Sequence, residues 1–451
     1  MYDFNTYITT LDNQIKPYLP QQNTPLYDAL VKPKDIFRIP LSEAEKLQFS
    51  CIKHVFIHHF NNNKFYHKYC KEQKITPEDI KTNQDLIKIP LISDKFFKSY
   101  PKDKYFATWL ANVYTGELPN IIIRQKKPRY DDVIKAFYDV GVVVSYSSGT
   151  GGRYTFIPRN RQTFLNAEYA LAKSLITMAY PLWKYDSYGY LLMPNPKKNF
   201  IFAGKALEVY CDAVKDVVSA IDREVTTELV QMTMGNKTGL KSKIVRYFSY
   251  RQTKKMVEEI ILWLEKHDNG KDTITLLGAP YILYSVLEKL KSEGKSFDFG
   301  ERGGIANGGG WKGIKTMTHE EYRNEIKKVL GIPGKYVLDV YSMVEGNGWM
   351  IHCPEGHYLH VPYAHYKALV VDEEFKSVGY DEKGRFAFLD GISTSHPSFI
   401  VTGDEVKLLE HCPVCDRPGP VLEPVIKRAK GEDTRGCAEE VRRMLSKDLS
   451  Q

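Results

Sequence analysis

The chain has 451 residues, of which 43% are hydrophobic and 26% are charged, and its formal net charge is +8. These proportions are typical of a globular protein with a sizeable core, and they argue against a disordered or fibrous chain. The excess of Lys and Arg over acidic residues, 63 against 55, is small and shows no dense basic cluster interleaved with aromatic residues, so we expect no nucleic-acid partner.

The N-terminal segment lacks a basic region followed by an apolar stretch, so we expect no secretory signal. A run of about 20 apolar residues, which a membrane span needs, is also missing, so we expect no membrane span. The seven cysteines are an odd number, and Cys51, Cys70, Cys211 and Cys437 are isolated. This usage indicates reduced thiols in a cytoplasmic protein.

Hydrophobic periodicity predicts alternating helices and strands. In chain order we expect a helix over 41–70, a strand over 139–146, a helix over 164–180, strands over 188–193 and 200–202, helices over 220–231 and 253–267, a strand over 273–277, a helix over 281–293, a strand over 335–340, and short strands with turns from 366 onward. This alternation predicts an α/β fold of layered subdomains with a more β-rich part near the end. The polar, glycine-flanked segment 430–436 is the clearest boundary candidate.

Residues 145–155 read SYSSGTGGRYT and follow a β-branched run. Glycines let backbone N–H groups converge on phosphate oxygens, hydroxyls add donors, and Arg153 can neutralise phosphate charge. The segment does not match the Walker pattern. On composition alone, an ordinary surface turn explains it equally well.

The sequence SSGTGGRYT resembles the phosphate-binding loop of the acyl-adenylate-forming superfamily, usually written S-S/T-G-T-T-G-x-P/x-T. Gly151 stands where Thr is common, and Arg153 stands where Lys is common. The resemblance implies that ATP phosphates contact Ser147, Ser148, Gly149, Thr150, Gly151 and Arg153.

Two further segments resemble the adenine site of this superfamily. The sequence NGGGWK at 307–312 resembles the glycine-rich segment beside adenine, which implies contacts from Gly308, Gly309 and Gly310. The sequence DVYSMVE at 339–345 resembles the Tyr-Gly-x-Thr-Glu segment, in which the aromatic ring (here Tyr341) stacks on adenine and the acid (here Glu345) helps to hold Mg²⁺. Val344 replaces the usual Thr and so removes a hydroxyl that contacts phosphate in the superfamily.

Two segments near the end resemble the ribose site. Thr402–Gly403–Asp404 matches the Thr-Gly-Asp of the superfamily, and a carboxylate such as Asp404 can accept two hydrogen bonds from a vicinal diol. Arg428 lies where an Arg of the superfamily also reaches the ribose. Each motif alone is weak, but all of them occur in the superfamily's order.

The N-terminal blocks Phe65–Lys68, Ile75–Ile80 and Ile89–Leu91, with the later block Gly356–Val361, resemble phenylacetate-CoA ligases. The Gly-Gly-Gly-Trp-Lys segment and the early end of the chain are more similar to the acyl-protein synthetases of bacterial luminescence, the LuxE type. These resemblances imply an adenylation domain over 1–428 and a short tail over 429–451 in place of a mobile domain. They also imply Cys437 as an acyl acceptor, although simple packing of this thiol in a terminal helix is an equally good interpretation.

The implied function is ATP- and Mg²⁺-dependent activation of a carboxylic acid, of the fatty class, to an acyl-AMP, with transfer to a protein thiol. An acyl reductase or an acyl carrier protein would then be the partner. Two alternatives stay open: an aryl- or acyl-CoA ligase that uses CoA, and a non-catalytic nucleotide-binding homologue.

Cysteine and histidine spacing suggests a structural zinc site. Cys353 and His357 form a C-x3-H pair, and Cys412 and Cys415 form a C-x2-C pair, which together supply four ligands of the kinds that tetrahedral zinc uses. His352 or His411 could replace His357. The rival interpretation is unliganded thiols in turns.

Overall fold

A large mixed sheet is the centre of the computed structural model, which describes residues 3–101, 105–147, 153–181, 184–234, 240–310 and 317–429. The strands are β1 (Ile92–Ser93), β2 (Val142–Tyr146), β3 (Phe156–Asn160), β4 (Tyr188–Pro194), β5 (Asp216–Ile221), β6 (Ile274–Gly278), β7 (Gly303–Gly308), β8 (Val337–Tyr341), β9 (Met350–His352), β10 (Leu359–His360), β11 (Tyr366–Val371), β12 (Lys383–Asp390), β13 (Phe399–Leu409), β14 (Val421–Leu422) and β15 (Lys427–Arg428). Strands β2 and β3 form a separate antiparallel pair. The large sheet runs in the order β11-β12-β13-β14-β10-β9-β8-β7-β6-β4-β5, and β1 and β15 pair with β13.

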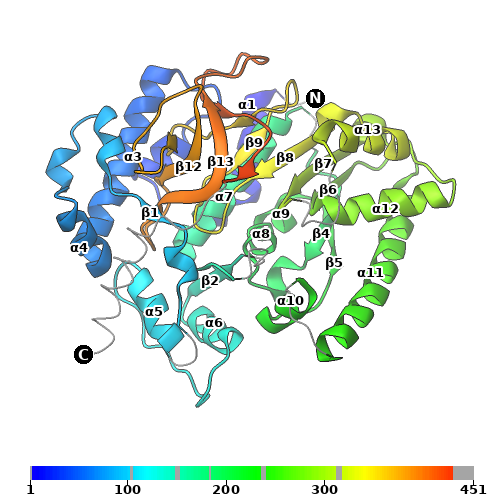
Figure 1. The fold of residues 1–451 in the computed structure, drawn as a ribbon. Helices are drawn as coiled ribbons and strands as arrows, with labels where there is room; N and C mark the ends of the chain where they lie inside the picture. The colour runs from blue at the N-terminus through cyan, green and yellow to red at the C-terminus, as the bar shows by residue number, and fades with distance from the viewer. Residues whose placement is uncertain are drawn as a thin grey trace.

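Helices surround this sheet (Figure 1). They are α1 (Phe4–Gln14), α2 (Pro25–Leu30), α3 (Leu41–Asn62), α4 (Lys64–Glu72), α5 (Tyr105–Val113), α6 (Tyr130–Asp139), α7 (Arg161–Ala179), α8 (Phe202–Lys205), α9 (Glu208–Ala213), α10 (Thr227–Met234), α11 (Leu240–His267), α12 (Pro280–Ser292) and α13 (His319–Leu330). A 3-10 turn, η4 (Phe96–Lys98), follows β1. Helix α13 shows why one such element starts and stops where it does: Thr318 and Glu321 form a capping box, and Gly331 ends the helix at φ +71°.

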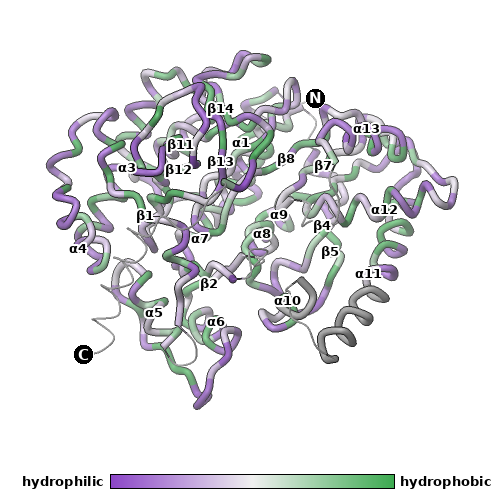
Figure 2. Tube along the Cα trace, in the orientation of Figure 1, coloured by the Kyte–Doolittle hydropathy of each residue, from purple (hydrophilic) through white to green (hydrophobic). Residues whose placement is uncertain are grey.

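Strands β5, β4, β6, β7 and β8 are parallel neighbours and carry helices on both faces. Successive residues of a strand point to opposite faces. Leu192 and Leu276 therefore join the core that includes α11, α12 and α13, whereas Leu191 and Leu277 join the core that includes α7 and α9. Hydrophobic residues gather along these strands in Figure 2, and the outer loops are mostly hydrophilic. The inner strands β4, β6 and β7 are thus largely buried on both sides, whereas the edge strand β5 is partly exposed.

The other half of the sheet is mostly antiparallel, from β9 to β12. Strand β8 joins the halves, because it pairs in parallel with β7 and antiparallel with β9. Layered α/β structure followed by a β-rich part is therefore confirmed. Of the expected tail over 429–451, only Ala429 lies within the described residues.

Three local expectations were wrong. The helix over 41–70 is two helices, because the Asn63 side chain accepts a hydrogen bond from the Tyr66 N–H and caps α4. The strand over 200–202 is a single bridge, Tyr146 to Ile201, before α8. The helix over 220–231 starts later, at Thr227, because 216–221 forms the edge strand β5 instead. Among the described helices, none combines the length and the apolar character that crossing a membrane requires.

Candidate nucleotide site

Strand pairing brings the residues expected at the ribose together. Asp404 on β13 lies opposite Arg428 on β15 in the antiparallel register, and Arg428 Nη1 is 3.1 Å from Asp404 Oδ1. The Tyr341 hydroxyl, at the end of β8, donates to Asp404 Oδ2 over 2.8 Å. Burial raises the pKa of Asp404, while Arg428 and Tyr341 act to lower it. One carboxylate therefore links the aromatic residue expected at adenine to the arginine expected at the ribose.

The glycine segment expected beside adenine lies on the neighbouring strand. Gly308 pairs with Val340, directly before Tyr341. Gly309 and Gly310 have φ angles of +82° and +65°, and a Cβ atom on either would meet no described atom within 4 Å. This left-handed backbone favours glycine, and no described atom crowds these two positions. Trp311 and Lys312 lie outside the described residues.

The base of the expected phosphate loop is closed by two hydrogen bonds. Thr155 N donates to Ser147 Oγ over 3.0 Å, and Ser147 N donates to Thr155 O over 3.1 Å. Arg153 is exposed and donates to the backbone carbonyl of Lys98 over 3.4 Å. The remaining predicted contacts of this loop, Ser148, Gly149, Thr150 and Gly151, lie outside the described residues.

Glu345 is buried in the loop that follows β8. Its backbone carbonyl accepts from Ser398 Oγ over 2.7 Å and lies 2.9 Å from His396 Nε2. Burial raises the pKa of the Glu345 carboxyl and Asp94 raises it further, whereas Lys98 and a hydrogen bond from Thr155 lower it. Glu345 therefore lies beside Thr155, at the base of the expected phosphate loop.

Arg159 on β3 is a residue that the sequence patterns did not single out. It is fully buried. Its Nε donates to Asn347 Oδ1 over 2.6 Å, its Nη1 donates to Ser145 Oγ over 2.9 Å, and its Nη2 donates to the carbonyls of Val344 and Gly346. Arg159 thus connects the loop that carries Glu345 to the β2–β3 pair that flanks the expected phosphate loop. The sequence did contain one indication of its role, because Arg159 directly follows the apolar residues Phe156–Pro158.

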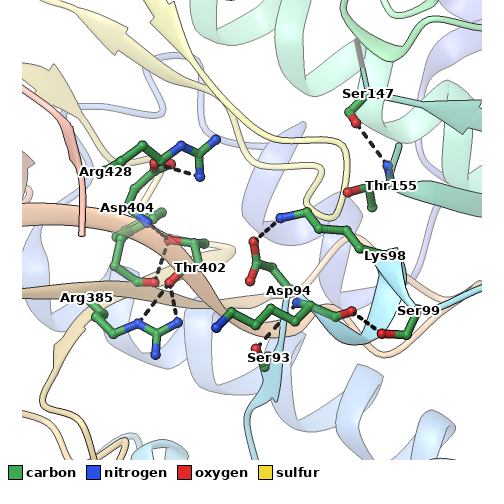
Figure 3. A network of polar contacts seen from close by, with 12 residues as sticks. Ser93, Asp94, Lys98, Ser99, Ser147, Thr155, Arg385, Thr402, Asp404 and Arg428 are labelled. Atoms are coloured by element: carbon green, nitrogen blue, oxygen red, sulfur yellow. Dashed lines mark hydrogen bonds and ion pairs between the residues drawn. The ribbon is translucent and has the colours of Figure 1, made fainter. Parts of the chain in front are cut away.

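Lys98 and Asp94 are two further residues that the sequence patterns missed. Figure 3 shows the Lys98 side chain between the Asp404–Arg428 pair and the Ser147–Thr155 pair. The Lys98 ammonium is 2.5 Å from Asp94 Oδ2. No motif marked these residues, because they come from an N-terminal segment far from the other site segments in the sequence.

The expected zinc ligands need one correction. The ligand atoms of Cys353, His360, Cys412 and Cys415 lie within 4.8 Å of one another, so His360 and not His357 completes the group. His360 lies opposite Ile351 in the β9–β10 pair, and side chains two residues apart share a face, which puts His360 on the face of Cys353.

The other histidines of this region do not reach the sulfur atoms. The His357 ring lies in the turn, with Nε2 3.1 Å from the Gly334 carbonyl. His352 points to the opposite face, toward the Asp339 N–H, and His411 is exposed. Cys415 Sγ is 3.3 Å from His360 Nε2, and its hydrogen bond with Cys353 lowers the pKa of the Cys415 thiol. Cys437, the expected acyl acceptor, lies outside the described residues.

Comparison with known proteins connects this geometry to a family. Residues 210–446 match the family described as acyl-protein synthetase, LuxE. A long-chain-fatty-acid–luciferin-component ligase of Aliivibrio fischeri is 22% identical over 415 residues, covering 90% of this chain and 91% of that protein. A ligase of the same name from Vibrio harveyi is 27% identical over 173 residues, covering 38% of this chain and 44% of that protein.

Among solved structures, an open conformation of 2-hydroxyisobutyryl-CoA ligase, in complex with 2-HIB-AMP and CoA, has a TM-score of 0.60 and 13% identity. The match covers 95% of this chain and 75% of that one, and it shows a shared fold. The family model spans more than half of the chain. The resemblance expected from the sequence is confirmed: the chain is a ligase that belongs to the LuxE family of acyl-protein synthetases.

Proposed function

We propose that this protein uses ATP to convert a long-chain fatty acid to an acyl-AMP and then passes the acyl group to a protein thiol. The observation that carries the proposal is the convergence of Tyr341, Asp404 and Arg428 on one side with Glu345 and the base of the phosphate loop on the other. The names of the two relatives, both fatty-acid ligases, support the substrate class.

Binding and charge placement do the chemical work in this proposal. Gly308–Gly310 and Tyr341 receive adenine, the Asp404 carboxylate accepts hydrogen bonds from the ribose diol, and Arg428 supports it. Ser147 and Arg153, with the loop between them, hold the phosphates. A carboxylate oxygen of the acid then forms a bond to the α-phosphorus while the bond to the β-phosphate oxygen breaks, and pyrophosphate leaves. Such a displacement needs positioning and charge stabilisation rather than a protein nucleophile.

Glu345 fits the role of a Mg²⁺ ligand. Its carboxylate is buried beside the Thr155 hydroxyl, and oxygen donors of this kind are the ones that Mg²⁺ prefers. When bound there, the ion would offset the negative charge of the phosphates.

The acyl acceptor in this proposal is Cys437, in a short tail over 429–451 that follows an adenylation domain over 1–428. A thiolate is a competent acyl acceptor, and the neighbouring arginines favour it. Attack of the Cys437 thiolate on the acyl carbonyl forms a thioester and releases AMP. An acyl reductase or an acyl carrier protein would receive the acyl group next.

We also propose that the group formed by Cys353, His360, Cys412 and Cys415 holds a structural Zn²⁺. Three thiols and one imidazole are a donor set that zinc favours, and four protein ligands leave no open position. The ion would tie the β9–β10 pair to the turn between β13 and β14.

Pyrophosphate exchange into ATP, measured across fatty and aromatic acids, tests the activation step. We expect exchange with long-chain fatty acids and a covalent, hydroxylamine-sensitive label on the protein from radioactive acid. That label should disappear in Cys437→Ser and persist in Cys211→Ser, which removes a thiol elsewhere. Formation of an acyl-CoA would instead favour the CoA ligase alternative. Absence of exchange with every acid would favour the non-catalytic alternative and overturn the proposal.

A further inference from the structure

The Asp94–Lys98 ion pair lies inside the nucleotide site although it comes from the N-terminal part of the chain. Strand β1 pairs in parallel with β13, so that Ser93 lies opposite Val401, and Asp94 N donates to the Val401 carbonyl over 2.9 Å. The turn η4 then brings Lys98 back over Asp94, with Lys98 Nζ 2.5 Å from Asp94 Oδ2.

This ion pair lies between the residues expected at the ribose and those expected at the phosphates. A Cβ atom on Gly403 would lie 3.8 Å from Asp94 Oδ2 and 3.4 Å from Arg428 Nη1, so Asp94 is next to the ribose end. The Lys98 carbonyl accepts from Arg153, so the same residue is also next to the phosphate loop. Figure 3 shows the Lys98 ammonium between the Asp404–Arg428 pair and the Ser147–Thr155 pair.

This ion pair differs from a surface pair. The Asp94 side chain is only 7% exposed, and its second oxygen, Oδ1, is buried without a hydrogen-bond partner in the described part of the chain. Burying a charged oxygen without a hydrogen-bond partner is costly, and such a group in a folded protein often has a functional role. Asp94 and Lys98 also act in opposite directions on the pKa values of Glu345 and Asp404, with Asp94 raising them and Lys98 lowering them, which agrees with an ammonium close to both carboxylates.

We propose that Lys98 is a catalytic residue whose ammonium contacts the α-phosphoryl oxygens of ATP and the incoming carboxylate, and that Asp94 is the positioning residue that aims it. The inference rests on the proposed acyl-AMP function. Arg428 is engaged by Asp404 at the ribose end, and Arg153 lies at the phosphate loop, whereas the point between them is where the acid must meet the α-phosphorus.

The chemistry suits a lysine. Two anions, the carboxylate and the phosphoryl group, must approach each other, and an ammonium between them reduces their repulsion. Asp94 engages one N–H of Lys98, which leaves the others for substrate oxygens. As the new C–O–P linkage forms and the bond to pyrophosphate breaks, Lys98 keeps its proton, so the step needs no proton acceptor.

Steady-state pyrophosphate exchange with full-length Lys98→Ala and Lys98→Gln, with ATP and palmitate, tests this inference. Because the contact strengthens at the transition state, we expect kcat to fall about 100- to 1,000-fold while KM for ATP changes little. Lys88→Ala is the matched control, since Lys88 forms a comparable ion pair with Asp85 on the surface, 52% exposed, and should keep wild-type kcat.

Chemical rescue separates a catalytic role from a structural one. Ethylammonium should restore part of the exchange activity in Lys98→Ala and none in Glu345→Gln. Wild-type kcat in both Lys98 variants, or folded variants that are inactive and not rescued, would overturn the inference while the proposed function stands. If the wild-type protein shows no pyrophosphate exchange with any of the acids tested, the proposed function itself fails.

Discussion

The Tyr341 hydroxyl donates a hydrogen bond to the Asp404 carboxylate over 2.8 Å, and this bond crosses from the parallel half of the sheet to the antiparallel half. Burial and the Asp404 charge raise the pKa of the Tyr341 phenol well above its ordinary value. The phenol therefore remains a donor at any physiological pH, and it orients the carboxylate that we assign to the ribose.

Tyr341→Phe keeps the ring and removes this hydrogen bond. A hydrogen bond to a charged group contributes about 1.5–3 kcal/mol, so we expect ATP affinity to fall about tenfold or more. Titration calorimetry with ATP measures the change. Tyr185→Phe serves as the control, because the Tyr185 hydroxyl donates to the Tyr7 carbonyl in a different part of the core. Equal ATP affinity in wild type and Tyr341→Phe would show that the Tyr341 hydrogen bond is not required to orient the Asp404 carboxylate.

Arg159→Met tests the connection between the β2–β3 pair and the loop of Glu345. Burial lowers the pKa of Arg159 to about 9, so the side chain is still a cation at neutral pH. Its removal leaves the Asn347 amide and two backbone carbonyls without their donor. A buried acceptor left without its donor costs about 1–3 kcal/mol, so for these three acceptors we expect the free energy of unfolding to fall by about 3 kcal/mol or more, as measured by urea denaturation.

Arg129→Met is the control for Arg159→Met, because Arg129 is 67% exposed and its ion pair with Asp132 is a surface pair. Surface pairs contribute about 0–1 kcal/mol, so this variant should unfold close to wild type. If the two variants lose the same small amount, the buried network does not stabilise the loop.

These residues show what the sequence could reveal. Asp404 and Arg428 were predictable because each belongs to its own short motif, which can be found without knowing how the two segments pair. Lys98 was not predictable, because it reaches the site only through the parallel pairing of a two-residue strand, Ile92–Ser93, with β13. His360 was missed for a related reason: the spacing rule favoured the nearer His357, whereas hairpin register decides which side chain faces Cys353. A sequence motif identifies residues by their local pattern, whereas only the pairing of distant strands shows which other residues lie next to them.

His365 gives the protein a predictable sensitivity to acid. It is completely buried, neither ring nitrogen has a hydrogen-bond partner among the described residues, and burial lowers its pKa to about 3. Between about pH 6.5 and pH 3 the unfolded chain binds a proton at this position and the folded chain does not. Stability from this residue is therefore present at neutral pH and is lost as the pH falls through that window.

His365→Leu should reduce that loss. Between pH 7 and pH 5 the wild type should lose about 2 kcal/mol more free energy of unfolding than the variant does, because each pH unit below 6.5 costs about 1.4 kcal/mol. Urea denaturation at both pH values measures the difference. His411→Leu is the control, since it removes an exposed histidine instead of a buried one. The same pH dependence in His365→Leu and wild type would contradict the assignment.

The proposed zinc site gives a prediction that tests whether His360, instead of His357, is the fourth ligand. Purified wild-type protein should contain about one equivalent of zinc, the complement of a four-ligand structural site. His360→Ala and Cys415→Ser each remove one ligand and should lose most of the metal, as measured by elemental analysis. His357→Ala should retain it, because the His357 ring contacts the Gly334 carbonyl instead. The cysteine ligands that remain in each zinc-free variant are then released, so both variants should react with a thiol reagent faster than His357→Ala does. Zinc retained in His360→Ala but lost in His357→Ala would restore the ligand set expected from spacing alone, and zinc absent from the wild type would leave four packed side chains without a metal.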